Sequence, residues 1–438
     1  MSLLNKDEAQ AILKKVLSFS KADECEVTLS GNAEGNIRTA RNAVSTAGEQ
    51  NYMSLLVSST FGKKTGVATI NEFDEASIEK VVRKAEELAK LAPDNPERMP
   101  LLGPQLYKDS ITFDQATADI TPESRADDVA KCIDVAKSSR LEAAAFYRNA
   151  SGFEAKMNSK GLFVYDKKTD VSFSVTIRNQ EGTGSGYISE RYNDVAKMDT
   201  ATLTRKAAAK ATGSVGAKAI EPGKYTVILE PLAAADLMSF LVSGLDARSA
   251  DEGRSYMSKS GGATRLGEQL FNEKVTIYSD PLNAEMPSTT WTDEGLPVEK
   301  VTWVKNGVIQ NLSYSRYWAS KKGVKPVPAP SNVIIEGGTA SLEDLISGTD
   351  KGILVTRFWY IRLVNPQTLV LTGLTRDGTF YIENGKIKFP IKNFRFNESP
   401  IIMLNNLEAL GKPVRSENMI VPPMKVRDFT FTSLSDAV

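Results

Sequence analysis

Acidic side chains at two places in the chain are the first candidates for chemistry. Asp246, Asp251 and Glu252 follow an apolar segment and could offer carboxylate oxygens to a hard cation. Their spacing is not that of an EF-hand, and a solvated charged loop after a helix is the simpler interpretation. Asp293 and Glu294 are adjacent, so in a strand they would point to opposite faces. Unless a turn intervenes, that arrangement disfavours a paired acid and base.

Three short motifs imitate catalytic or nucleotide-binding patterns. Residues 62–66 combine glycine, lysine and threonine but lack the GxxxxGK[ST] spacing of a phosphate loop. Residues 182–186 lack the continuation of GxGxxG, so they predict a flexible hairpin. Residues 18–21 match SxxK, yet they end an amphipathic helix and have none of the partner motifs of that enzyme class. None of the three supports a catalytic site.

Histidine is absent from all 438 residues. Imidazole is the commonest zinc ligand and the usual general base near neutral pH. Its absence excludes a His-ligated metal site, a Ser-His-Asp triad or a Cys-His pair built from this chain. The residues alone therefore give no catalytic constellation.

Composition and the N-terminal residues indicate the compartment. Cys25 and Cys132 are the only cysteines, which is typical of a reducing compartment and predicts two buried thiols. Lys plus Arg equals Asp plus Glu at 54 each, so no global positive field favours nucleic acid. Asp7 and Glu8 lie where a signal peptide needs apolar residues, and no apolar run reaches membrane-spanning length. We therefore expect a cytoplasmic protein that contacts neither nucleic acid nor membrane directly.

The elements that would position a site recur in the first half. Apolar residues at three- and four-residue spacing predict helices over residues 5–17 and 74–92, with strands and a hairpin turn between them. Four prolines from Pro93 to Pro104 predict a linker. A second helix, strand and helix order follows, from a capped helix at Thr121 to a helix over about 200–211. The expected strands are 26–29, a stretch near Ile37, 52–59, 65–70 and 171–177.

The second half is rich in predicted strands. A buried strand over residues 225–229 precedes an apolar helix over 231–245. Further strands are expected at 274–278, 301–304, 352–356, 369–372, 379–382 and 425–432, with a hairpin turn at 383–386. The whole pattern predicts an α+β fold in which duplicated helix and antiparallel-sheet layers precede a β-rich domain. The expected units are an N-terminal α+β domain (1–95), a Pro-rich linker (96–120), a central α+β domain (121–220) and a C-terminal β-rich domain (221–438).

An ordered set of short sequences in the second half resembles the TldD/PmbA family, also called modulators of DNA gyrase. The first half agrees in its opening helix, the strand at Cys25, the hairpin and the helix at Asp74, so the resemblance runs nearly from end to end. The short sequences are Gly267-Glu268-Gln269, Thr292-Asp293-Glu294-Gly295-Leu296-Pro297, Lys305-Asn306-Gly307-Val308-Ile309, and Tyr381 to Ile387 before Pro390.

The resemblance implies a metallopeptidase system that processes peptides and unfolded segments. In it a TldD-like subunit binds zinc through HExxxH on a helix and pairs with a PmbA-like, or TldE-like, subunit. The correspondence places Ser239 and Gly244 at the two histidines and Phe240 at the glutamate. The family's later cysteine ligand is also missing. We therefore expect no catalytic residue and no cofactor in this chain, with zinc only in a TldD-like partner.

The three replacements are chemically disabling. A serine hydroxyl is a poor zinc ligand, glycine has no side chain, and phenylalanine can neither activate water nor take a proton. Residues 237–245 are then expected to be a buried core helix.

Two functions stay open from the sequence. The first is a non-catalytic TldE/PmbA-like subunit that associates with a TldD-like zinc peptidase or with itself and holds peptide in extended form. The second is a homodimer that binds peptides or a topoisomerase partner and catalyses nothing. A hydrolase that uses serine or carboxylates is a third alternative. Residues 358–362 depart from the best-known PmbA members, which leaves the partner and the substrate open.

Overall fold

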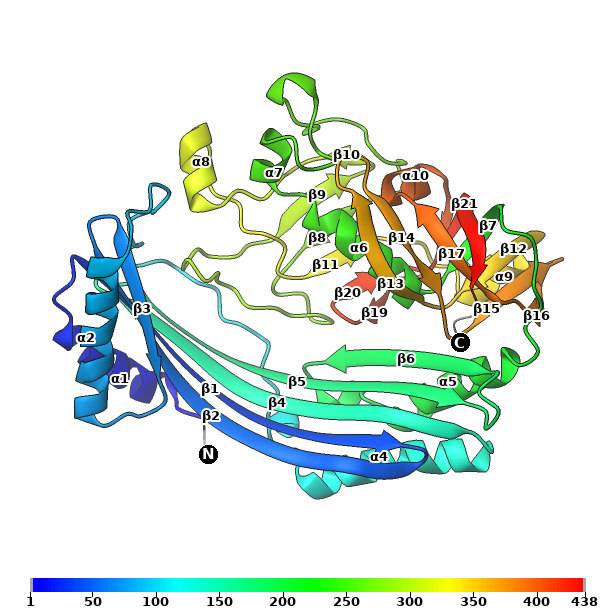
Figure 1. Ribbon diagram of the computed structural model, residues 1–438, viewed down its shortest axis with the longest axis horizontal. Helices are drawn as coiled ribbons and strands as arrows, with labels where there is room; N and C mark the ends of the chain where they lie inside the picture. Colours follow the sequence, from blue (N-terminus) through cyan, green and yellow to red (C-terminus); the bar gives the residue numbers. More distant parts are fainter. Residues whose placement is uncertain (1–2, 436–438) are drawn as a thin grey trace.

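The first half of the chain builds one long antiparallel sheet of six strands. In the computed structural model, which describes residues 3–435, the strand order is β3-β2-β1-β4-β5-β6 (Figure 1). β1 and β4 pair through the centre of the sheet, from Glu26 to Arg38 on β1. The strands are β1 (Glu24–Ala40), β2 (Ala43–Phe61), β3 (Lys64–Ile70), β4 (Glu142–Asn158), β5 (Phe163–Arg178) and β6 (Ser185–Tyr192).

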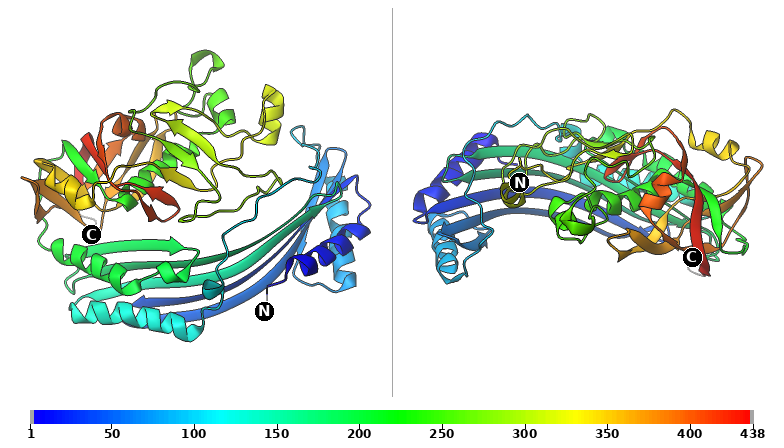
Figure 2. Two further views of the ribbon diagram at one scale, coloured as in Figure 1. Left: turned by 180° about the vertical axis from the view of Figure 1, so that it is seen from behind. Right: turned by 90° about the horizontal axis from the view of Figure 1, so that it is seen from above.

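Four helices cover the convex face of this sheet, two for each half of it (Figure 2). α1 (Lys6–Phe19) and α2 (Glu75–Leu91) flank the first three strands, and α4 (Pro122–Ser138) and α5 (Thr200–Gly213) flank the last three. Asn5 starts α1 by accepting hydrogen bonds from N–H groups of the first turn, which have no partner within the helix. The order of helix, antiparallel strands and helix therefore occurs twice, as the sequence predicts, and each half contains three strands.

Strand alternation sends apolar side chains to the convex face. Val27 of β1 and Ala155 of β4 pack in one core with α1 and α2. Tyr147 of β4 and Phe173 of β5 pack in a second core with α4 and α5. The side chains between these positions point to the concave face, which lies toward the second half of the chain (Figure 1).

Several strands are longer than the sequence pattern predicts. The strands expected at 26–29 and near Ile37 are parts of one strand, β1, and the strand expected at 52–59 is the last part of β2. β4 is not predicted at all. Small and polar residues such as Ala144, Arg148 and Gly152 occupy much of it, so its apolar alternation is weak.

The second half contains two further sheets. One has six strands in the order β10-β9-β8-β11-β20-β19, and the other has nine, in the order β13-β14-β17-β21-β7-β12-β15-β16 with β18 beside β21. Their strands are β7 (Lys224–Leu229), β8 (Ile277–Ser279), β9 (Val301–Lys305), β10 (Val308–Ile309), β11 (Val333–Ile335), β12 (Lys351–Val355), β13 (Phe358–Asn365), β14 (Val370–Thr375), β15 (Thr379–Glu383), β16 (Lys386–Pro390), β17 (Asn393–Glu398), β18 (Leu407–Leu410), β19 (Val414–Ser416), β20 (Met419–Val421) and β21 (Met424–Ser435).

The helices of this half are short except for α6, which packs against strands of both sheets of this half (Figure 1). The predicted hairpin at 383–386 is confirmed, with Asn384 and Gly385 at φ of +50° and +70°. The strand expected at 274–278 is largely wrong, because β8 begins only at Ile277. The α+β fold is confirmed. The helices are α6 (Pro231–Ser243), α7 (Ala247–Asp251), α8 (Arg316–Lys322), α9 (Leu342–Ser347) and α10 (Pro400–Asn405).

The segment predicted as a linker, residues 96–120, lies between the two halves and bonds to both. Tyr107 donates a hydrogen bond to the carbonyl oxygen of Gly295 at 2.7 Å. The Lys108 carbonyl accepts one from the hydroxyl of Thr290 at 2.8 Å. One short helix, α3 (Gln115–Ala118), interrupts the segment. The boundaries expected for the domains stay a prediction.

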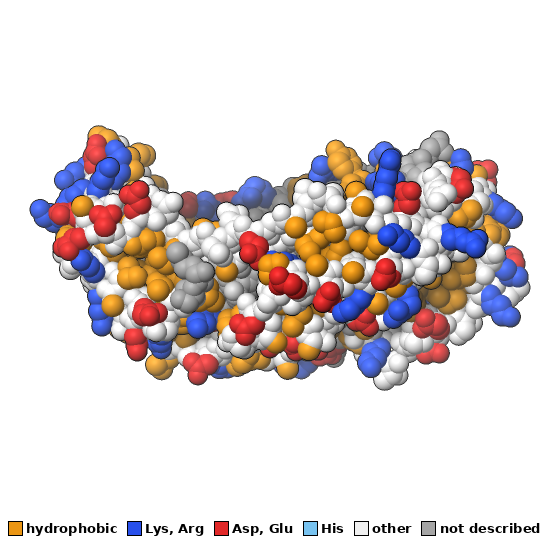
Figure 3. Space-filling view, turned by 90° about the horizontal axis from the view of Figure 1, so that it is seen from below, with side chains coloured by type: hydrophobic (Ala, Val, Ile, Leu, Met, Phe, Trp, Pro, Cys, Tyr) orange, Lys and Arg blue, Asp and Glu red, His pale blue; other side chains and the backbone are white. Residues whose placement is uncertain are grey.

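The surface agrees with the balanced charge of the sequence. On the face shown in Figure 3, acidic and basic side chains are interspersed, with small hydrophobic groups between them. Within residues 3–435, no helix combines the length and the apolar character that a membrane crossing requires.

Candidate functional site

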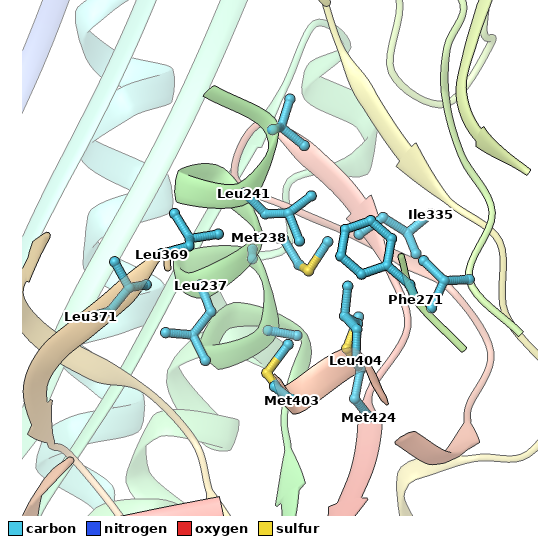
Figure 4. Packing of buried hydrophobic residues seen from close by; sticks show 14 of the residues in the cluster. Leu237, Met238, Leu241, Phe271, Ile335, Leu369, Leu371, Met403, Leu404 and Met424 are labelled. Carbon is cyan, nitrogen blue, oxygen red and sulfur yellow. The ribbon is translucent and has the colours of Figure 1, made fainter. Parts of the chain in front are cut away.

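The helix that the resemblance aligns with the zinc motif is α6, and one side of it is core. Leu237, Met238 and Leu241 are at most 1% exposed. They pack with Phe271 and Leu404, which come from a loop and from α10 (Figure 4). The expectation of a buried core helix is confirmed for these positions.

The three motif positions themselves do not form a metal site. Ser239 is exposed, and its hydroxyl donates to the carbonyl oxygen of Asp236 at 2.8 Å. Phe240 is half-buried against the core. Gly244 ends the helix, and a Cβ atom there would lie 2.4 Å from the ring of Tyr256, which is 1% exposed. One hydroxyl, one phenyl ring and no third side chain do not fit a zinc ion.

The acidic residues after α6 have structural roles. Asp246 accepts from the N–H of Ser249 at 2.7 Å and so begins α7. Asp251 accepts from the indole N–H of Trp318 at 2.7 Å. Glu252 is paired with two arginines, Arg254 and Arg248, whose hydrogen bonds lower its pKa. Nowhere in residues 3–435 do three or more His, Cys, Asp or Glu side chains gather in a way that could hold a metal ion.

The remaining motifs are also structural. Residues 62–66 form the hairpin between β2 and β3, and residues 182–186 form the turn and the start of β6. The hydroxyl of Ser18 donates to the carbonyl oxygen of Lys15 within α1. Cys25 and Cys132 are buried as expected, and burial raises the pKa of both thiols. A raised pKa keeps a thiol protonated and unreactive.

Sequence reasoning does not find a large cleft that lies between the concave face of the six-stranded sheet and segments of the second half. It consists of two adjoining cavities of about 560 Å³ and 540 Å³, which we call cavity A and cavity B. Both are lined by Glu154, Lys168 and Thr289. The strands supply a polar floor because every second residue of β1, β4 and β5 faces this side.

Cavity A contains a network of arginines and carboxylates. Arg148 bonds Glu34 at 2.6 Å and Asp170 at 2.8 Å, and Arg191 bonds Asp170 through its Nε atom. The hydrogen bond from Arg148 lowers the pKa of Glu34. Arg415 reaches the same cavity from β19. Cavity A thus presents three guanidinium groups and, close to them, the carboxylates of Glu34 and Asp170.

Cavity B is mainly acidic. Glu154, Asp246, Asp293 and Glu294 line it together with one cation, Lys168. Burial raises the pKa of Glu154, and the charges of Lys168 and Lys156 lower it more than the charge of Asp293 raises it.

Asp293 and Glu294 lie in a turn and not in a strand, which is the alternative that the sequence left open. Gly295, at φ of +79°, makes a turn in which Thr292 N–H donates to the Leu296 carbonyl oxygen at 2.9 Å. The turn therefore brings both adjacent carboxylates to one cavity.

The cleft offers groups that can bind a ligand. Its side chains offer hydrogen-bond donors, acceptors and charges of both signs, but no imidazole and no activated nucleophile. The residues come from β1, β4, β5, β6, β19 and loops near residues 290 and 330, which no local sequence pattern connects. Only the fold brings them together.

Two family models match this chain. The PmbA/TldA metallopeptidase C-terminal domain matches residues 222–433, and the PmbA/TldA metallopeptidase central domain matches residues 116–215. Together they cover well over half of the sequence, and they confirm the resemblance described above.

Relatives and solved structures agree with the models. The metalloprotease PmbA of Escherichia coli O157:H7 is 21% identical over 97% of this chain and 98% of its own length. A metalloprotease of Methanothermobacter thermautotrophicus is 22% identical, and the match spans 61% of this chain and 62% of that protein. The crystal structure of TldE from Thermococcus kodakarensis superposes with a TM-score of 0.86 at 20% identity, covering 97% of this chain and 100% of that one. A protein of Thermotoga maritima described as a modulator of a DNA gyrase gives a TM-score of 0.87 at 19% identity, with the same coverage.

Proposed function

Because this chain belongs to the PmbA/TldD metallopeptidase family, we propose that it is a non-catalytic, TldE/PmbA-like subunit of a peptidase system that acts in proteolysis or peptide maturation. The observation that carries the proposal is the composition of α6. Ser239, Phe240 and Gly244 replace the ligands and the general base of the family's zinc motif. In this proposal the chain helps to bind and position the peptide, and its partner supplies the zinc ion.

The change of residue types is one argument against a metal site on α6, and the geometry of the helix is a second. Ser239 is turned to solvent, whereas the position of Gly244 is closed by the buried ring of Tyr256. A longer side chain at Gly244 would need the Tyr256 ring to move, and that ring is held by a hydrogen bond from its hydroxyl to the Leu241 carbonyl oxygen at 2.7 Å. Packing has therefore filled the space that a ligand side chain would need.

An exposed apolar strand supports association with another chain. β13 is an edge strand of the nine-stranded sheet. Four of its side chains are strongly exposed: Trp359 (42%), Tyr360 (63%), Leu363 (46%) and Val364 (59%). Clustered apolar side chains on an edge strand favour a protein interface, since left uncovered they promote aggregation. A TldD-like zinc peptidase or a second copy of this chain would cover them.

The cleft supports a peptide as the ligand. A long, polar sheet face roofed by loops offers hydrogen-bonding groups along its whole length, which suits an extended backbone more than a compact small molecule.

The proposal is tested by metal content and cleavage. The purified chain is assayed by mass spectrometry for zinc, and its action on an unfolded protein is measured alone and with a purified TldD-like subunit. We expect no stoichiometric zinc, no cleavage by the chain alone, and chelator-sensitive cleavage by the pair. Tightly bound stoichiometric zinc, with chelator-sensitive cleavage by this chain alone, would overturn it.

The alternative is a homodimer that binds peptides or a protein partner such as a topoisomerase and is not part of a peptidase. The exposed strand β13 is compatible with it, because a second copy could cover the same side chains. Light scattering of the chain alone and in a mixture with the TldD-like subunit separates the two functions. A stable homodimer that does not exchange with the TldD-like subunit would favour the alternative.

A further inference from the structure

We propose that the cleft selects extended peptides by the arrangement of their charges, binding those with a cationic group at one end and a carboxylate about six residues away. The inference rests on the proposed peptide-binding function and adds the class of peptide. The cationic end lies in cavity B and the carboxylate end in cavity A.

The acidic end is built around an unpaired carboxylate. Among residues 3–435, Glu154 forms no hydrogen bond and no ion pair within 4 Å. It lies directly opposite Asp166 in the pairing of β4 with β5, and like charges at such a position oppose each other. Asp293 and Glu294 approach from the roof of cavity B. The charges of Lys168 and Lys156 offset part of this repulsion, and an ammonium or guanidinium group of a ligand would relieve the rest.

At the basic end, the guanidinium groups of Arg191 and Arg415 make only some of the hydrogen bonds that they could donate. Arg191 bonds Asp170 through Nε alone, so within the described chain its two terminal NH₂ groups have no acceptor. Arg415 donates to the carbonyl oxygen of Glu285 at 2.6 Å, but its buried Nε has no acceptor in residues 3–435. Arginine forms strong paired hydrogen bonds with carboxylates. A ligand carboxylate would find free donors here.

The separation of the two ends fixes the length of the peptide. Glu154 and Arg148 lie six residues apart on β4, and Arg191 lies two strands away, opposite Ser172, the partner of Arg148. At about 3.3 Å per residue, the two ends are about 20 Å apart. An extended peptide that runs along β4 covers the same distance with about six residues.

Buried polar atoms without partners along the cleft suit a peptide backbone. The Oδ1 atom of Asn193 in cavity A has no donor, and the indole N–H of Trp291 in cavity B has no acceptor, among the residues that the structure describes. Trp291 is only 6% exposed, so the unmade hydrogen bond is costly. A peptide supplies both an N–H and a C=O group at each residue. Charges at the ends and backbone bonds between them therefore point to the same ligand.

The test compares two fluorescent octapeptides of identical composition with blocked ends. One has two lysines at one end and two aspartates at the other, and the second has the same residues with lysine and aspartate alternating. We expect the separated arrangement to bind at least about tenfold more tightly, by anisotropy at low salt, and the difference to shrink as salt is added. Equal affinities would overturn the inference while leaving the peptide-binding function intact. No binding of either peptide would overturn both.

Single variants locate the two ends. Glu154→Gln and Arg191→Gln should each weaken binding of the separated peptide several-fold and leave the alternating peptide unchanged. Glu343→Gln, an exposed carboxylate on α9 outside the cleft, serves as the matched control and should change neither. Unfolding temperatures check that each variant is folded. If Glu154→Gln binds the separated peptide as tightly as the unmodified chain, the assignment of cavity B is wrong.

Discussion

Gly66 on β3 and Gly186 on β6 have equivalent roles in the two halves of the six-stranded sheet. A Cβ atom on Gly66 would lie 2.2 Å from the backbone nitrogen of Ala89 in α2, and one on Gly186 would lie 2.1 Å from the carbonyl oxygen of Ala207 in α5. In each half a helix rests directly on the outer strand, and only glycine permits that approach. The duplication predicted from the order of elements thus extends to the packing.

Gly186→Ala should therefore destabilise the protein by about 1–3 kcal/mol, because a methyl group would push the backbone of α5 away from the sheet. Gly48→Ala is the matched control on the same sheet, since a Cβ there meets only the side chain of Asn36, at 3.9 Å. Urea unfolding of both variants measures the difference. If Gly186→Ala is as stable as Gly48→Ala, the close packing of α5 is not required.

Leu241→Asp should destabilise by several kcal/mol, about 3 or more, because it buries a carboxylate without a partner in the core beside α6. Leu241 is fully buried, whereas Ser239 on the same helix is exposed. Ser239→Gln, measured in the same unfolding experiment, should be nearly neutral. A stable, soluble Leu241→Asp variant would show that α6 is not a core helix.

Rebuilding the zinc motif with Ser239→His, Phe240→Glu and Gly244→His should not create a peptidase. The side chain at position 244 would collide with the ring of Tyr256, and no further ligand is in place. Gly244→Ala alone should already cost about 1–3 kcal/mol, while Ser243→Ala, at an exposed neighbouring position, should not. Zinc analysis and cleavage assays of the triple variant complete the test, and zinc-dependent cleavage would contradict it.

Asp236 on α6 should contribute a loss of stability as the pH rises from about 4 to about 7. Burial raises the pKa of this carboxyl group to about 7, although it accepts a hydrogen bond from the Phe358 N–H at 3.3 Å. Over that range the folded state binds the proton and the unfolded state releases it, so rising pH favours unfolding. Asp236→Asn removes this titration and should lessen the loss of stability between pH 5 and pH 7.5 by about 2 kcal/mol.

Urea unfolding at the two pH values measures the effect of Asp236. Asp134→Asn, at an exposed position of α4, is the control and should lose stability with pH as the unmodified chain does. Parallel curves for Asp236→Asn and the unmodified chain would show that this carboxyl group is already ionised in the folded state at pH 5.

Local signals explain what could be predicted from the sequence. The capping residues Asn5, Asp74 and Thr121 begin helices where expected, since each accepts a hydrogen bond within the first turn that follows it. The hairpin at Asn384 and Gly385 is equally local. β4 could not be found in this way, because small and polar residues such as Ala144, Arg148 and Gly152 weaken its apolar alternation.

The cleft depends still more on distant contacts. Lys156 of β4 donates to the carbonyl oxygen of Asp293, 137 positions later in the chain, and so helps to hold the acidic turn over the sheet. No sequence motif around either residue predicts this contact. The proposed replacement of the zinc motif, in contrast, could be inferred from the sequence because the family resemblance supplies the positions to compare.

The pairing of β1 with β4 has a consequence for how the protein is made. β1 ends at Ala40 and β4 begins at Glu142, so about 100 residues separate them. At synthesis rates of about 5–20 residues per second, the ribosome needs roughly 5–20 seconds to deliver the second strand. During that interval, the backbone N–H and C=O groups on the β4 side of β1 have no partner strand in the nascent chain. Chaperones that shield exposed strand edges can act on the chain in this interval.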